Sequence, residues 1–582
     1  MAEGAAHIYR FGPFTLDVAD RSLKRHGTFL PITPKAFDLL VTLVESTGRL
    51  VQKDALLQKV WPDVAVEEGN LTKAVFSLRQ LLEDENGPRY IETVPKRGYR
   101  FVAEVTGGTE SAPTVLPKPA RSPSDDSIAV MPFRDMSAAR DQAFFCEGMS
   151  EEIINALGRV PDLRVASYTS SLRFKGKVTD TLTIGRELMV TWLLEGSVRK
   201  SGDTVRIAVQ LVRAADGFSA WSGRFDRQLD DIFSVQDDIA GMIAQTLTQR
   251  VAKTAAPLVT SKTAKNEAYA LYLEGRYLWN KRPGDVVWQA LDRFERAIGL
   301  DPGFAPAHAA LASVYGTLGA WELGVLPPAE ALAKAKAAAR RALELDPQLA
   351  AGHTAVGYTK LHFDWSADAA CREFDQAIAL NPAWVDAHHW HSHALCAARR
   401  FSESLAACRQ IVELDPLNPL MHAHVAWHYY MARSYAEALT QAEQVVRMEP
   451  GFHWGSFFAG WALERLGRPT EAITALKDAV ARSSNNPVML AGLGHALASS
   501  RDRKKALTVA RELERLRGDK GLFAYEIGLI QAALGDEDKA FAWLVRAVQE
   551  RSGWIAYLRV DPRLDHLHDD LRFQNLLADK RQ

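Results

Sequence analysis

Residues Val66–Val102, VEEGNLTKAVFSLRQLLEDENGPRYIETVPKRGYRFV, decide how the rest of the chain is organised. The first half predicts a helix, because its apolar residues recur every three or four positions. Asn86-Gly87-Pro88 ends this helix, and the second half predicts a β-hairpin with Lys96 and Arg97 at its tip. A helix followed by a basic-tipped hairpin is typical of DNA binding, since the helix fills the major groove and the tip reaches the minor groove or a phosphate. The residues expected on the buried side of the helix are Leu71, Val75, Leu78 and Leu82.

The motifs of this stretch resemble the end of an OmpR/PhoB-type winged-helix domain. The matching hairpin residues are Ile91–Val94 and Arg97–Arg100. Upstream, residues 30–40 (LPITPKAFDLL) are similar to the first helix of that family, and residues 53–60 to its second. The resemblance covers residues 7–105 and implies an α+β domain that binds DNA, with short antiparallel strands before the first helix.

We expect the DNA contacts on the outer face of the predicted helix and on the hairpin, or wing. Where the resembled response regulators often carry two basic residues, this chain has Phe76-Ser77, and a phenylalanine could contact a thymine methyl group. Thr72 and Arg79 suit phosphates, and Trp61 matches a residue that either binds phosphate or packs in the core. The candidate DNA-binding residues are Trp61, Asn70, Thr72, Lys73, Phe76, Ser77, Arg79, Thr93, Lys96, Arg97, Tyr99 and Arg100.

Length and composition predict a multidomain globular protein without a membrane anchor. The chain has 582 residues, 47% of them apolar, and a formal net charge of −1. Its four cysteines form no CxxC pair, which favours reduced thiols over disulfides or a zinc site. Activators of the CadC type carry a transmembrane helix after this domain, but here residues 106–126 form a linker rich in Pro, Ser and Thr. No run reaches the ~20 apolar residues that a spanning helix needs, so we expect a cytoplasmic location.

Residues 127–252 predict a small α/β domain. Alternating apolar residues indicate antiparallel strands around a turn at Ser201–Asp203. The segment resembles the small domain, similar to the N-terminal part of TolB, that lies between output and repeat modules in bacterial signalling proteins. The expected strands are 127–133, 163–166, 192–199, 205–213 and 219–225, and the expected helices are 148–157, 181–188 and 232–251.

Residues 266–550 contain internal repeats, marked by an acidic or amide residue before proline. These prolines are spaced 45, 35, 34, 34 and 37 residues apart, near the tetratricopeptide period of about 34. The longest gap predicts an insertion near Trp321–Pro328, and residues 551–582 predict a C-terminal capping helix. The prolines are Pro302, Pro347, Pro382, Pro416, Pro450 and Pro487.

Histidines gather in one part of the repeats and raise the question of a metal site. They stand among Trp and Ala on predicted helices without matched carboxylates, so we interpret them as packing or solvated residues and predict no metal. The paired acids near Asp230 and Asp237 open a helix, which suits its dipole. Glycine-rich phosphate loops and nucleophile elbows are absent, so we predict no catalytic residue, no cofactor and no enzyme.

These patterns predict a winged helix-turn-helix domain, then a small α/β domain, then an all-α tetratricopeptide solenoid. The expected function is sequence-specific regulation of transcription: the first domain binds double-stranded promoter DNA, the others sense a signal or bind a protein or peptide, and RNA polymerase is a candidate partner. No receiver domain precedes the winged helix, so phosphorelay control is not predicted. The alternatives are an interaction scaffold whose winged helix contacts protein, and a regulator whose middle domain binds a small ligand. The candidate partner-binding residues are His388, His391, His422, Trp427 and Trp454.

Overall fold

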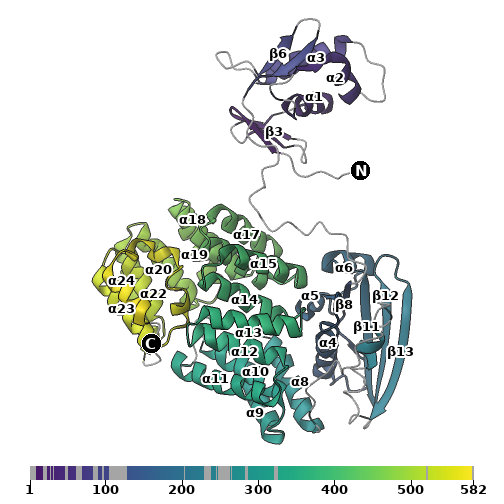
Figure 1. Ribbon diagram of the computed structural model, residues 1–582, viewed down its shortest axis with the longest axis vertical. Helices are drawn as coiled ribbons and strands as arrows, with labels where there is room; N and C mark the ends of the chain where they lie inside the picture. Colours follow the sequence, from purple (N-terminus) through teal and green to yellow (C-terminus); the bar gives the residue numbers. More distant parts are fainter. Residues whose placement is uncertain are drawn as a thin grey trace. The chain divides into compact units, whose positions relative to one another are not determined.

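The computed structural model forms two compact units, Met1–Val115 and Leu116–Gln582. The elements of both units are labelled in Figure 1. The structure describes residues 8–17, 22–25, 28–30, 32–45, 47, 50–60, 68–82, 90–94, 97–103, 127–201, 204–228, 238–243, 246, 263, 265–281, 286–319, 326–518 and 522–579.

The first unit is a winged helix-turn-helix domain, as predicted. Four antiparallel strands come first, in the order β1-β2-β3-β4, and a second sheet has the order β5-β7-β6. The strands are β1 (Ile8–Phe11), β2 (Phe14–Asp17), β3 (Ser22–Arg25), β4 (Thr28–Leu30), β5 (Leu50–Gln52), β6 (Ile91–Val94) and β7 (Gly98–Phe101), and the helices are α1 (Pro34–Glu45), α2 (Lys53–Val60) and α3 (Glu68–Leu82).

An aromatic core joins the N-terminal sheet to the wing. The rings of Phe11 and Phe101 lie 5.0 Å apart, and those of Phe14 and Tyr90 lie 5.5 Å apart, both edge to face. Edge-to-face pairs of this kind stabilise beyond the burial of their area. The N-terminal sheet therefore packs against the wing through these aromatic side chains.

Gly98 is required where the wing meets β5. A Cβ atom at this position would stand only 2.0 Å from the backbone oxygen of Val51, and backbone cannot move aside as a side chain can. Gly98→Ala should therefore destabilise residues 1–115 by about 3 kcal/mol or more. Thermal melting followed by circular dichroism measures this, and Gln80→Ala, on the exposed face of α3, is the control that should melt as the wild type does. Equal melting of both variants would contradict the assigned strand pairing.

The second unit begins with a mixed sheet in the order β10-β8-β11-β12-β13, with β9 also paired to β11. Strands β10, β8 and β11 are parallel, whereas β11, β12 and β13 are antiparallel. Of the predicted helix 232–251, the structure describes residues 238–243 and 246, all helical. The strands are β8 (Ser127–Val130), β9 (Arg134–Asp135), β10 (Arg164–Val165), β11 (Trp192–Ser201), β12 (Thr204–Arg213) and β13 (Ser219–Gln228), and the helices are α4 (Ala143–Leu157), α5 (Tyr168–Leu172) and α6 (Thr181–Leu188).

In the described part of the chain, the predicted solenoid follows as eight consecutive helix pairs, α8 to α23. The predicted small-aromatic-small positions Ala290, Phe294 and Ala297 are fully buried, because paired helices cross closely there. The expected insertion lies between α10 and α11, where residues 320–325 are outside the described residues. The helices are α8 (Asn266–Asn280), α9 (Val286–Leu300), α10 (Ala305–Leu318), α11 (Pro328–Leu345), α12 (Ala350–His362), α13 (Ala367–Leu380), α14 (Val385–Ala397), α15 (Phe401–Leu414), α16 (Pro419–Met431), α17 (Tyr435–Met448), α18 (His453–Arg465), α19 (Pro469–Arg482), α20 (Pro487–Ser499), α21 (Arg503–Arg517), α22 (Ala524–Ala533) and α23 (Glu537–Gln549).

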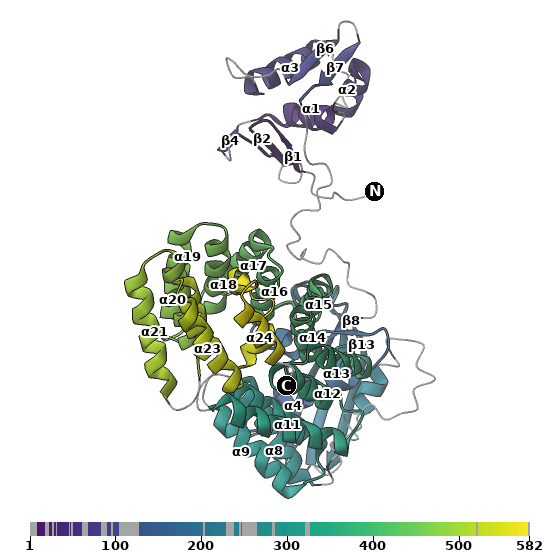
Figure 2. The ribbon, with the colours of Figure 1, turned by 60° about the vertical axis from the view of Figure 1, so that its left-hand side comes forward.

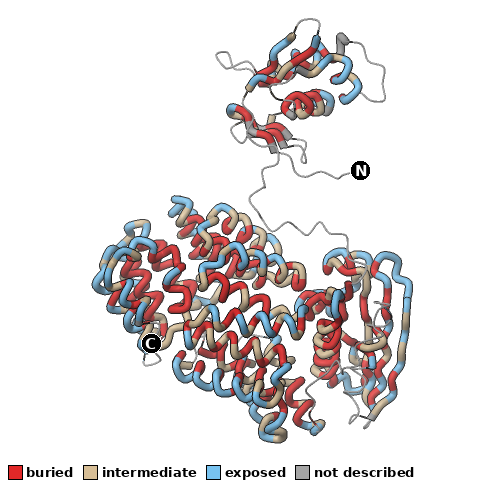
Figure 3. The backbone as a smooth tube through the Cα atoms, in the orientation of Figure 1, coloured by how far each residue is buried: buried red, intermediate tan, exposed pale blue. Residues whose placement is uncertain are grey.

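One hydrophobic core spans the α/β region and the first repeats. Helix α4 lies between the sheet and α8, and its residues Phe145 and Met149 belong to the same buried cluster as Leu273 and Phe294 of the solenoid (Figure 1). Figure 3 shows buried residues along α4 and mostly exposed ones along the edge strand β13. The α/β region and the first repeats of the solenoid therefore share one buried core.

A buried carboxylate makes a second connection between the α/β region and the solenoid. Ser167 and Ser170, at the start of α5, both donate hydrogen bonds to Asp415, which is 1% exposed. Burial raises the pKa of Asp415, and the serine hydrogen bonds oppose that rise. Asp415 belongs to one of the Asp-Pro pairs that mark the repeats, so the α/β region docks on a turn of the solenoid.

The C-terminal segment differs from the single capping helix that we predicted. It forms two 3-10 helices, η3 (Gly553–Tyr557) and η4 (Pro562–Leu567), before the helix α24 (Leu571–Asp579). Segment η3 contacts α12 and α14, and η4 contacts α22. Figure 2 shows this yellow end of the chain inside the curve of the solenoid. The segment folds inward because Trp554, Tyr557 and Leu564 can bury their side chains there.

Candidate nucleic-acid interface

Helix α3 has one buried and one exposed face, as its sequence predicts. Leu71, Val75, Leu78 and Leu82 are at most 1% exposed, which confirms them as core residues. Thr72, Lys73, Phe76 and Ser77 lie on the exposed face. The side of α3 that faces away from the core therefore combines one cation, two hydroxyl groups and an aromatic ring.

Phe76 is the most unusual residue on this face, since it is 61% exposed on a helix whose other large apolar residues face the core or lie partly buried. An exposed phenylalanine is costly in water and gains free energy when a partner covers it. A thymine methyl group in the major groove is an apolar surface of suitable size.

Arg79 holds α3 against the wing. Its guanidinium donates to the backbone oxygen of Ile91 at 2.8 Å and to the Thr93 hydroxyl at 2.8 Å. These bonds fix the angle between the helix and strand β6. Arg79 and Thr93, both candidates for phosphate contacts, are thus brought together, and their first role is to position the two surfaces that would contact DNA.

Arg97 is an exposed cation directly before strand β7 of the wing. The Arg97 amide donates to Val94 at 3.1 Å, and the Lys53 amide donates to the Arg97 oxygen at 3.3 Å, so the backbone is held at both ends. The Arg97 side chain is exposed. Arg100, further along β7, lies 3.5 Å from the Glu92 carboxylate, which offsets its charge.

Tyr99 corrects the predicted set of DNA contacts. It is only 5% exposed and belongs to the core of the first unit, because it lies on the same face of β7 as the buried Phe101. Trp61 and Lys96 lie outside the described residues, as does the side chain of Asn70. The described members that remain on the surface of α3 and the wing are Thr72, Lys73, Phe76, Ser77, Arg79, Thr93, Arg97 and Arg100.

Two of the histidines predicted to bind a partner in the solenoid are buried and hydrogen-bonded. His388 and His422 are 8% and 4% exposed. Each ring nitrogen Nε2 lies close to the oxygen of the proline six residues earlier, at 2.8 Å in His388 and 2.9 Å in His422. His308 and His353 make the same contact in other repeats. This recurrent hydrogen bond ties these four proline turns to the helices that follow them, and its signal in the sequence is a proline followed six positions later by histidine.

The remaining candidates for partner binding are also buried or partly buried. Trp427 is 3% exposed and its ring lies 5.2 Å from that of Tyr557, because the C-terminal segment covers the inner side of the solenoid. Trp454 is 7% exposed and packs against Phe458. His391 is partly buried, with Nε2 3.4 Å from an Asp375 oxygen.

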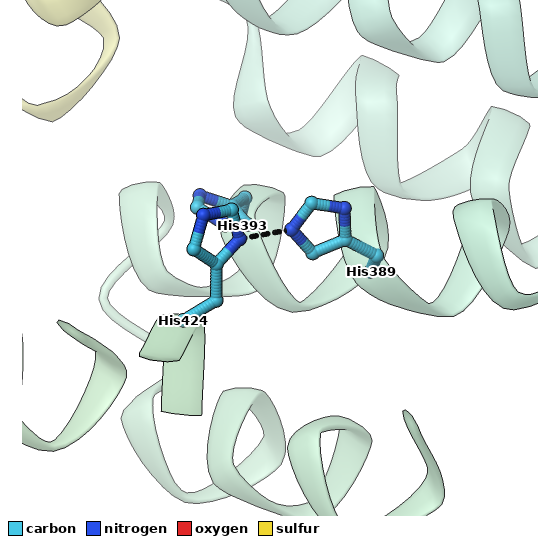
Figure 4. Close-up of side chains that lie close together, drawn as sticks. All are labelled: His389, His393 and His424. Carbon is cyan, nitrogen blue, oxygen red and sulfur yellow. Dashed lines mark hydrogen bonds between the residues drawn. The ribbon is translucent and has the colours of Figure 1, made fainter. Parts of the chain in front are cut away.

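Three other histidines converge between α14 and α16 (Figure 4). His389 and His393 lie one helical turn apart on α14, and His424 lies on α16, one repeat later. One ring nitrogen from each lies within 4.8 Å of the others. Burial lowers the pKa of His424 to about 4 and that of His393 well below 6.5, so both rings are neutral at pH 7. We predicted packing or solvated histidines here, and the sequence signal for their convergence is the i, i+4 spacing combined with a repeat-length offset.

Family models match three parts of the chain. Residues 27–101 match the C-terminal domain of transcriptional regulatory proteins. Residues 124–242, which we compared with TolB, match the second domain of HilA/YgeH-like transcriptional regulators. Residues 426–487 and 492–553 match tetratricopeptide repeats. The chain therefore carries an OmpR/PhoB-type winged-helix domain, a HilA-like regulator domain and tetratricopeptide repeats.

Individual relatives match different parts of the chain. The transcriptional regulator HilA of Salmonella typhi is 24% identical over 444 residues, 75% of each chain. A putative adenylate cyclase 3 of Rhizobium meliloti is 35% identical over 240 residues, and the match spans 40% of either chain. The solved DNA-binding domain of E. coli CadC is 32% identical, with a TM-score of 0.17, and covers 18% of this chain and 100% of its own.

Among the described helices, we find none that is both long and apolar enough to cross a membrane.

Proposed function

We propose that the protein is a sequence-specific DNA-binding regulator of transcription. Helix α3 would enter the major groove with Lys73, Phe76 and Ser77 toward the bases, and the wing would place Arg97 at the minor groove or a phosphate. The observation that carries this proposal is the exposed face of α3, held beside the basic wing tip by the bonds of Arg79. The exposed cation Arg97 on the wing suits the negative charge of the DNA backbone.

The second unit, in this proposal, receives a signal or binds a protein and alters the activity of the first. Its domain limits would be 127–252 and 266–550, after a linker at 106–126 and before the C-terminal segment 551–582. We further propose a cytoplasmic location, where promoter DNA is found, RNA polymerase as a partner, and no enzymatic activity. The HilA-like match over residues 124–242 supports a regulatory role for this unit.

The fragment Met1–Val115 tests the proposal, since it has its own core. We expect the fragment to fold and to bind duplex DNA with an affinity that falls steeply with salt, because binding displaces counterions from phosphates. A gel-shift series at increasing salt measures this slope, and DNA fragments selected by the full-length chain supply the specific sequence. A folded fragment and full-length chain that both fail to bind at low salt would favour the interaction scaffold.

A further inference from the structure

The hydrogen bonds around His393 determine which of its nitrogens carries the proton. His362 Nδ1 lies 3.2 Å from the backbone oxygen of Tyr358, which can only accept, so Nδ1 donates. In a neutral imidazole the other nitrogen then accepts, and His362 Nε2 receives the hydrogen bond of the Tyr557 hydroxyl at 3.2 Å. The Tyr557 oxygen in turn accepts from His393 Nδ1–H at 3.2 Å. His393 Nε2 is therefore left with a bare lone pair.

This lone pair has no hydrogen-bond partner among the described residues, although the atom is buried. An unsatisfied buried polar atom costs about 1–3 kcal/mol, so such atoms are rare unless something binds them. Next to it, His389 Nε2 and His424 Nδ1 contact each other. His428, a fourth neighbour, differs because its two nitrogens contact the hydroxyl groups of Ser392 and Ser404.

We propose that His389, His393 and His424 bind one divalent transition-metal ion of the kind that prefers imidazole nitrogen, such as Zn²⁺. Metal–nitrogen distances of about 2.0–2.1 Å place tetrahedral ligands roughly 3.3–3.5 Å apart. The three nitrogens already lie within 4.8 Å of one another, so side-chain shifts of about 1–1.5 Å complete the site. Neutral imidazole is the form that binds metal.

The surroundings fit such an ion. Tyr557 bonds the non-ligating nitrogen of His393, which fixes the orientation of the ring in the way that outer-shell partners of metal-binding histidines do. A cavity of about 30 Å³ adjoins His393 and His424, walled by aromatic rings that include Trp390, Trp427 and Tyr557. It has room for a water molecule as fourth ligand. Because Tyr557 lies on η3, the ion would also help to hold the C-terminal segment inside the solenoid.

Metal titration of the tag-free, full-length protein tests this site after a chelator has removed bound metal. Calorimetry with Zn²⁺ should give one ion per chain, and Co²⁺ should give the visible spectrum of a four-coordinate nitrogen site. His424→Gln and His389→Gln should each lower the affinity by about 100-fold or more. The matched control is His422→Gln, on the same helix as His424, which should bind as the wild type does. Circular dichroism checks that each variant is folded.

Several outcomes would overturn the site. Absence of saturable binding of Zn²⁺, Co²⁺, Ni²⁺ or Cu²⁺ by the folded wild type would show that the histidines only pack. An equal loss in His422→Gln and in both ligand variants would show that the effect is on folding. A Co²⁺ spectrum with thiolate character would place the ion on the buried cysteines, Cys146, Cys371, Cys396 or Cys408.

Discussion

Replacing Lys73 and Arg97 together with alanine should lower the affinity for every duplex sequence by roughly 100-fold at low salt. Both side chains are exposed, one on α3 and one at the wing tip, and neither is required for the core. If each contacts one phosphate, the slope of log affinity against log salt should become flatter by about 0.9 per residue, or about 1.8 in total. Gel shifts at several salt concentrations, with specific and random duplexes, measure both quantities.

The matched control removes two cations from the second unit. Arg296→Ala with Lys334→Ala changes the net charge by the same amount, but both residues lie on the solenoid, where they pair with Asp292 and Glu330. This variant should retain the wild-type affinity and slope. If the two double variants behaved alike, the salt dependence would reflect overall charge, and α3 and the wing would not be the contact surface.

Removing the guanidinium of Arg563 should destabilise the second unit by about 3–5 kcal/mol, since it leaves a buried carboxylate unpaired. Arg563 is 5% exposed and Asp561 is fully buried, and their two hydrogen bonds measure 2.9 and 2.7 Å. The arginine also lies 4.0 Å above the ring of Trp461. Burial tends to raise the pKa of Asp561, but the attraction of Arg563 and the hydrogen bonds outweigh it and leave the pKa below 3.8.

Chemical denaturation of Arg563→Ala, followed by tryptophan fluorescence, measures this loss because Trp461 and Trp554 border the arginine. The control is Arg515→Ala, which removes a comparable but exposed ion pair with Glu512. Surface pairs contribute about 0–1 kcal/mol, so the control should change little. A loss below 1 kcal/mol in Arg563→Ala would mean that η4 does not hold the inner side of the solenoid.

Local sequence patterns predicted the elements of this protein well. The apolar stripe of α3 and the period of the prolines each depend on residues a few positions apart, and burial confirmed the expected core positions of α3. The exposed set on α3 followed from the same periodicity. The prediction of Tyr99 as a surface residue was wrong because Tyr99 lies, like Phe101, on the face of β7 that packs on the core, and the hairpin motif alone did not reveal that face.

The repeat pattern could not predict the burial of the solenoid histidines or the path of the C-terminal segment. His388 and His422 stand where a groove residue would, and a hydrogen bond to a proline oxygen occupies each ring. Trp427 is covered by Tyr557, 130 positions further along, because the C-terminal segment folds back inside the solenoid. No period in the sequence indicates such a return.

The sequence by itself determined that the chain has a winged helix with a basic tip, an α/β region and a tetratricopeptide solenoid, because each depends on contacts between near neighbours or between equal repeats. Only the tertiary structure decided that the α/β region and the solenoid share a core through α4, and that Asp415 joins them. It also decided that His393 meets His424 and Tyr557. These contacts join residues far apart in the chain, and they form where burial of apolar side chains and pairing of buried polar groups are satisfied together.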